Sequence, residues 1–148
     1  MRRGIVNYGE SVRARLLVSI RAIRLSRRSF QVMVARGLLN SRLKDYYDLW
    51  LLTENFDFDL ALLRTAIGRT FSRRATAIPS ATPDALSPTF SIGDVSKQRQ
   101  WRAFARKTHL DVLELASVVV RLAEFLAPTF GNECSENLSW RHDEACWR

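Results

Sequence analysis

Acidic, basic and aromatic side chains are concentrated in one ten-residue segment, Ser41–Trp50. On a helix, Arg42 and Asp45 are i,i+3 neighbours, as are Asp45 and Asp48, and Lys44 lies one turn before Asp48. A carboxylate beside a cation suits a phosphate-handling site, because the carboxylate holds a metal or orients a nucleophile while the cation neutralises phosphate charge. The same spacing also fits a surface ladder of ion pairs, each worth about 0.3–0.5 kcal/mol, so spacing alone leaves both interpretations open.

Positive charge is concentrated at the N-terminus. The chain has 23 Lys and Arg against 15 Asp and Glu, and residues 1–30 hold eight arginines and a single acid. Three interpretations of this basic arm stay open: phosphate contacts with nucleic acid, an organellar transit peptide, or an amphipathic helix whose arginines face water or a partner. The arginines that would contact RNA or an acidic partner are Arg13, Arg15, Arg21, Arg24, Arg27 and Arg28, the first four of which are the principal candidates.

Length and composition indicate one globular domain in a reducing compartment. At about 100–200 residues per domain, 148 residues make one domain or a piece of a larger one. The chain is 47% apolar and 26% charged, which argues against disorder. No apolar run approaches the roughly 18 residues of a membrane-spanning helix, and two cysteines are too few for a disulfide framework. We therefore expect a cytoplasmic protein that does not enter the membrane.

Apolar residues recur with helical spacing in about five segments, which predicts a mainly α fold without a confident strand. The predicted helices cover about 11–26, 41–53, 60–74, a segment after Asp94 and a last segment from Asp111 to Pro128. Residues 30–37 favour helix slightly over strand, with a break near 37–40 because Gly37 weakens a helix by about 1 kcal/mol relative to Ala.

The predicted organisation has three parts. Residues 1–29 form a basic amphipathic helix or arm, residues 30–127 form the helical region with a proline-rich connector over 75–93, and residues 128–148 form a poorly ordered tail. We expect no metal site in the tail, because Cys134, His142 and Cys146 lack the spacing of a zinc pair.

The segment Asn40–Leu52 resembles the Arg-x-Lys-Asp-aromatic-aromatic-Asp-Leu motif of the AbiEii/AbiGii nucleotidyltransferase toxins. The likeness covers about 34–127 and continues through Phe56–Asp59, Thr70–Arg74 and Lys97–Phe104. A shorter match at 11–17 resembles the N-terminus of that family.

The resemblance implies a toxin of a toxin–antitoxin or abortive-infection pair that transfers a nucleotide from an NTP with Mg²⁺. It implies that the helices correspond to the C-terminal helical part of a nucleotidyltransferase-fold toxin. Asp45 matches the active-site aspartate, Lys44 its basic neighbour, and Arg42 and Asp48 the positions expected at the substrate phosphates. A cognate antitoxin is the implied partner.

The chain departs from the family where the nucleotide cradle is expected. No two of its six glycines are adjacent and no Gly-Ser pair exists, although the family carries a glycine-rich strand-turn followed by paired aspartates. The Asp57-Phe58-Asp59 segment follows the Lys-Asp motif and is better interpreted as the N-cap of a helix.

We therefore expect an internally truncated member that is inactive alone, needs no cofactor alone, and self-associates through apolar stripes left exposed. The alternative is a small basic helical module that binds RNA or a protein.

Overall fold

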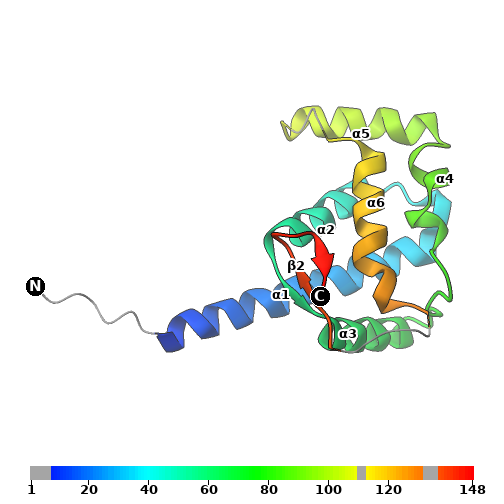
Figure 1. Cartoon of the computed structure of the whole chain (residues 1–148). Coiled ribbons are helices and arrows are strands. Elements are labelled where there is room, and N and C mark those ends of the chain that lie inside the picture. The colour runs from blue at the N-terminus through cyan, green and yellow to red at the C-terminus, as the bar shows by residue number, and fades with distance from the viewer. Residues whose placement is uncertain (1–7, 110–112, 132–136) are drawn as a thin grey trace, which may run out of the picture.

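The computed structural model describes residues 8–109, 113–131 and 137–148, and over 8–16 it describes the helical backbone only. The long elements are α1 (Tyr8–Arg36), α2 (Leu43–Asn55), α3 (Leu60–Arg73), α5 (Val95–Lys107) and α6 (Leu115–Leu126). A short helix α4 (Pro88–Ser91) precedes α5, and the strands are β1 (Phe58–Asp59), β2 (Ser139–Arg141) and β3 (Cys146–Trp147). The mainly α prediction is confirmed, with the addition of a small sheet (Figure 1).

Helix α1 is one continuous element, whereas the sequence predicted a helix over 11–26 followed by an uncertain segment. No glycine or proline lies between Gly9 and Gly37, so nothing interrupts the helix at residue 29. The predicted break at Gly37 is confirmed: Gly37 has φ +56° and opens a 3₁₀ turn, Gly37–Leu39. The N-terminal half of α1 projects beyond the rest of the fold (Figure 1).

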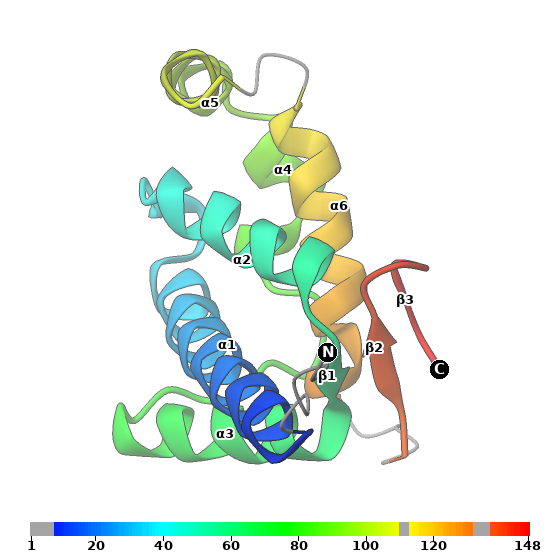
Figure 2. The ribbon, with the colours of Figure 1, turned by 90° about the vertical axis from the view of Figure 1, so that its left-hand side faces the viewer.

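The core lies between α1, α2, α3 and α6. Figures 1 and 2 show α1 beside α3 at one end of the molecule and α5 at the other, with α2 and α6 between them. Each helix contributes one buried face, because its apolar residues recur every three or four positions. The buried residues include Phe30 and Met33 of α1, Tyr46 and Leu49 of α2, Leu63 and Ile67 of α3, and Leu122 and Phe125 of α6. Within the described residues, no helix combines the length and apolarity needed to cross a membrane.

The connector over 75–93 takes part in the core despite its lack of periodicity. A 3₁₀ turn, Asp84–Leu86, buries Ala85 and Leu86, and Phe90 of α4 is fully buried. Helix α4 begins at Pro88, which fits the first turn because its missing N–H needs no partner there. The connector thus packs against Tyr46 of α2 and against α6 and completes this side of the core.

The prediction of a poorly ordered tail is wrong for residues 128–131 and 137–148. Strands β1, β2 and β3 form one antiparallel sheet in that order, with Phe58 opposite Trp140 and Trp140 opposite Trp147. The indole of Trp140 donates to the Thr53 carbonyl at 2.9 Å, and that of Trp147 donates to the Phe125 carbonyl at 3.0 Å. These two indoles dock the tail on α2 and α6, which explains its order. Cys134 lies outside the described residues.

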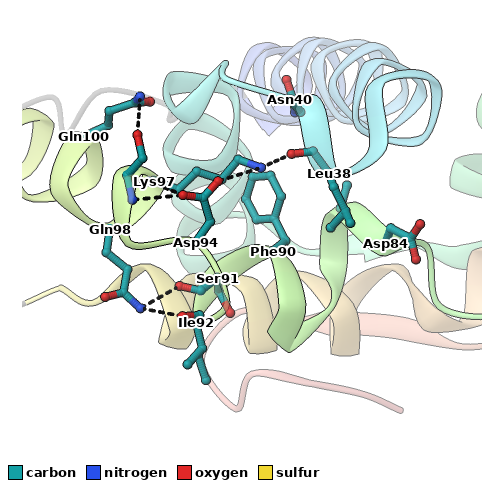
Figure 3. A network of polar contacts seen from close by, with 12 residues as sticks. Leu38, Asn40, Asp84, Phe90, Ser91, Ile92, Asp94, Lys97, Gln98 and Gln100 are labelled. Atoms are coloured by element: carbon teal, nitrogen blue, oxygen red, sulfur yellow. Dashed lines mark hydrogen bonds and ion pairs between the residues drawn. The ribbon is translucent and has the colours of Figure 1, made fainter.

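Helix α5 is attached to the loop before α2 through a buried lysine (Figure 3). The Lys97 ammonium donates to the Leu38 carbonyl, lies 3.8 Å from the Asp94 carboxylate and stands 4.1 Å from the Phe90 ring centroid. Asp94 also caps α5, as the sequence predicts, by accepting from the backbone N–H groups of Ser96 and Lys97. This network holds α5 against the chain that leads into the Arg42–Asp48 segment.

Candidate functional site

The predicted catalytic and phosphate-binding residues lie at the start of α2: Arg42 is its N-cap, and Lys44, Asp45 and Asp48 stand in its first two turns. The Asn40 side-chain oxygen accepts from the Arg42 backbone N–H at 3.2 Å, which satisfies a donor that the start of the helix leaves free. Asp45 stands in the first turn, where a negative charge is favoured by the helix dipole. The buried side of α2 carries Leu43, Tyr46, Leu49 and Thr53. The charged residues between them are therefore held at the surface of a firmly packed helix.

Asp45 and Arg42 form one ion pair, with Arg42 Nε 3.0 Å from Asp45 Oδ2. The Asp45 side chain is 15% exposed, whereas that of Arg42 is 51% exposed. Together they line a hollow of about 270 Å³ between α1, α2 and the end of α3. Its other lining residues are Leu25, Arg28, Ser29, Val32 and Arg74. The mostly buried carboxylate of Asp45 thus lines a hollow together with three arginines. We call this hollow the Asp45 hollow.

Lys44 and Asp48 form a separate pair, 2.7 Å apart, and neither residue lines the Asp45 hollow. The Lys44 side chain is 74% exposed. The hydrogen bond that it donates to Asp48, with the charge of that carboxylate, holds the pKa of Lys44 above its ordinary value. Lys44 is therefore a stable cation rather than a base. The four residues that the sequence groups together divide into one pair at a hollow and one pair at the open surface.

The aromatic residues of the motif serve the core. The Tyr46 hydroxyl donates to the Ala85 carbonyl at 2.7 Å, and its ring stacks on Phe90 with centroids 4.9 Å apart. Burial raises the pKa of Tyr46 above its ordinary value, so the phenol stays protonated. Tyr47 packs between Trp50 and Phe104. Packing inside the protein thus explains the positions of Tyr46 and Tyr47, and no stacked nucleobase is needed to explain them.

The arginines of the predicted N-terminal arm are only partly described. Arg21 and Arg24 are exposed on α1, and the side chains of Arg13 and Arg15 lie outside the described residues. Arg28, which the sequence assigned to the basic arm, and Arg74, which it did not single out as a site residue, line the Asp45 hollow from α1 and from the end of α3. The sequence feature that points to these two residues is the pair of Arg-Arg dipeptides at 27–28 and 73–74. Only the packing of α1 on α3 brings these pairs together.

The two acids of the Asp57-Phe58-Asp59 segment have different partners. Asp59 caps α3 by accepting from the Leu62 backbone N–H at 3.0 Å, as the sequence predicts. Asp57 accepts from the backbone N–H of His142 at 3.0 Å and lies 2.7 Å from its ring Nδ1. Partial burial acts to raise the pKa of Asp57, but these hydrogen bonds and the nearby positive charges outweigh it and leave the pKa below its ordinary value.

Asp57, His142 and Asp143 form an exposed group whose potential ligand atoms lie within 4.8 Å of one another. The Arg141 guanidinium, however, lies 4.0 Å from Asp57 and 3.7 Å from Asp143, so one cation of the protein already stands beside both carboxylates and offsets part of their charge. This group ties β1 to β2. Asp45 belongs to no such group of three among the residues that the structure describes.

The chain matches the family described as nucleotidyl transferase AbiEii toxin, type IV TA system, over residues 28–130. This range covers most of the chain and includes α2 and every lining residue of the Asp45 hollow except Leu25, so the chain belongs to the AbiEii nucleotidyl transferase toxin family. No curated protein and no solved structure matches the chain.

Proposed function

We propose that this chain is the motif-bearing helical part of an AbiEii-type toxin, in which the Asp45 hollow receives the phosphates of a nucleoside triphosphate. Membership of a family of nucleotidyl transferase toxins supports this proposal. The observation that carries it is that Asp45, which the sequence resemblance aligns with the family's active-site aspartate, lines a hollow together with Arg28, Arg42 and Arg74.

The residues of the hollow have distinct roles in this proposal. Arg42 uses its Nε–H to orient the Asp45 carboxylate, and its other guanidinium N–H groups remain to bind a phosphate. Arg28 and Arg74 add positive charge from the opposite side. Asp45 orients the group that attacks the nucleotide. Lys44, kept protonated by Asp48, stands one residue before Asp45 on the open surface outside the hollow.

Nucleotidyltransferases generally use Mg²⁺, and the described residues around Asp45 do not form a site for it. Mg²⁺ requires near-octahedral oxygen ligands, and catalysis of phosphoryl transfer usually places two metal ions between paired carboxylates. Asp45 is a single carboxylate bound to Arg42, and Asp48 is bound to Lys44. We therefore propose that the chain alone does not transfer nucleotides, because the metal pair and the phosphate cradle of the family have no counterpart among the described residues around Asp45.

A cognate antitoxin is the partner that a type IV toxin–antitoxin family implies. A second candidate function is a module that binds RNA or an acidic protein through the basic arm. The exposed side chains of Arg21 and Arg24 on α1 favour it. Binding by counterion release would weaken steeply between about 50 and 200 mM salt.

Titration of the chain with ATP tests the proposed hollow. Arg42→Gln should weaken ATP binding by about tenfold or more, because a hydrogen bond to a charged group contributes about 1.5–3 kcal/mol. Asp45→Asn should preserve or strengthen binding, since it removes negative charge from the hollow. Arg99→Gln, an exposed position on α5, is the control for loss of one charge. Unchanged binding in Arg42→Gln would overturn the proposal.

A further inference from the structure

Five arginines surround a second hollow, which lies between the middle of α1 and the C-terminal end of α3. Figure 2 shows these two helices side by side. The hollow has a volume of about 400 Å³. Its lining residues are Arg24, Arg27, Arg28, Thr70, Arg73 and Arg74, and we call it the arginine hollow.

Helix geometry places these side chains on facing surfaces. Arg24, Arg27 and Arg28 follow the i, i+3, i+4 spacing and therefore share one side of α1. Arg73 is the last residue of α3 and Arg74 is its C-cap, where cations are favoured by the helix dipole. The dipole accounts for these last two residues only. It does not account for three more arginines brought against them from α1.

No protein carboxylate neutralises the arginine hollow within the described part of the chain. Its lining contains no acid, and none of its five arginines belongs to an ion pair among the described side chains. Two of them are held by neutral acceptors: Arg27 donates to Thr70 Oγ1 at 3.0 Å, and Arg74 donates to Gln31 Oε1 at 2.9 Å. These bonds fix the direction of the guanidinium groups and leave their charge uncompensated.

The gathered charge is unfavourable in the absence of an anion. The pKa of Arg27 lies below its ordinary value because of partial burial first and then repulsion by Arg73, Arg24, Arg28 and Arg74. Like charges so close destabilise one another, and exposed arginines have the freedom to point apart. A bound anion would remove this repulsion.

We propose that the arginine hollow binds adjacent phosphate groups of an oligophosphate or polynucleotide chain. Guanidinium groups bind phosphate oxygens through paired N–H donors, which makes arginine the preferred residue for this chemistry. Several phosphates fit better than one, because the cations come from two helices. Arg28 and Arg74 also line the Asp45 hollow, so the positive surface continues toward Arg42. Binding at the arginine hollow does not require the transfer chemistry proposed above.

The test compares two variants that each lose two positive charges. Arg24→Gln/Arg73→Gln changes exposed residues that line the arginine hollow and not the Asp45 hollow. Arg99→Gln/Lys107→Gln changes exposed residues of α5, at the other end of the molecule (Figure 2). The probes are tripolyphosphate, a fluorescein-labelled decamer of oligouridylate, and an oligoglutamate peptide of matched charge. Circular dichroism melting checks that both variants fold, and the single Arg24→Gln variant replaces the double one if it melts early.

The proposal predicts that the hollow variant binds the decamer about tenfold or more weakly, while the control variant stays within about twofold of the unchanged chain. The slope of log K against log salt should become shallower by about 0.7 for each phosphate that the variant no longer neutralises. Binding of both phosphate probes identifies a site for phosphate chains in general, and binding of tripolyphosphate alone identifies a site for small oligophosphates. The proposal is overturned if neither phosphate probe binds, if both variants weaken binding equally, or if oligoglutamate binds as tightly.

The two experiments fail independently. The effect of Arg42→Gln on ATP binding reports on the Asp45 hollow alone, because Arg42 does not line the arginine hollow. Arg24→Gln/Arg73→Gln leaves every residue that lines the Asp45 hollow in place.

Discussion

Tyr46 illustrates how a residue of the motif supports the site without taking part in its chemistry. Its hydroxyl donates to the buried Ala85 carbonyl, and Tyr46→Phe would leave that carbonyl without this partner. We expect Tyr46→Phe to lower the free energy of unfolding at pH 7 by about 1–3 kcal/mol, the cost of an unsatisfied buried polar group. Urea denaturation followed by circular dichroism measures this change.

The pH dependence of stability gives a second readout for Tyr46. Because burial raises its pKa above the ordinary value of 10.0, the folded state keeps the phenol protonated. The stabilisation is complete below about pH 10 and is lost as the pH rises above it, since the unfolded chain then releases a proton that the folded chain holds. The difference between the unchanged chain and Tyr46→Phe should therefore shrink above pH 10. A constant difference up to about pH 11 would contradict this account.

The pairing of charges along α2 could be predicted from sequence, but the residues that share the Asp45 hollow could not. Arg42 with Asp45 and Lys44 with Asp48 follow directly from helical spacing. Arg28 and Arg74 reach the same hollow from α1 and from the end of α3. Their meeting depends on how two helices pack, and periodicity within one helix carries no information about this.

At the scale of elements, Lys97 connects α5 to the loop that precedes α2 (Figure 3). Lys97→Met keeps the length of the side chain and removes its ammonium, so the Leu38 carbonyl and the Asp94 carboxylate both lose a partner. We expect a loss of about 1–3 kcal/mol in the free energy of unfolding. Lys107→Met, an exposed position on the same helix, should change it by less than about 0.5 kcal/mol. Equal effects in the two variants would show that Lys97 makes no special contribution.

Long periodic helices were predictable, and short strands were not. The stripes of α2, α3 and α6 give clear helical spacing, and the caps Asp59 and Asp94 mark two helix starts. Strands β1, β2 and β3 have two or three residues each, too few for an alternating pattern to appear. Strands β2 and β3 are held in place by indole hydrogen bonds to α2 and α6, which are tertiary contacts. Asp111, predicted to begin the last helix, lies outside the described residues.

At the scale of the whole molecule, α1 exposes several large apolar side chains on its projecting part (Figure 1). Leu17 is 60% exposed and Ile20 is 45% exposed. Contiguous exposed apolar surface favours association, so we expect the chain to self-associate at micromolar concentrations. Leu17→Gln/Ile20→Gln should shift sedimentation equilibrium toward the monomer. Leu39→Gln, an exposed position off α1, should not. A chain that is monomeric before any change would contradict this expectation.

We propose that α2 supplies one wall of a nucleotide-transfer site whose paired metal ligands and phosphate cradle have no counterpart among the described residues around Asp45. The most direct measurement is incubation of the purified full chain with Mg²⁺, RNA and each labelled NTP in turn, alongside Asp45→Ala. We expect no incorporation above the protein-free blank for either protein, because a single ion-paired carboxylate does not replace paired metal ligands. Robust incorporation by the unchanged chain that disappears in Asp45→Ala would contradict the account.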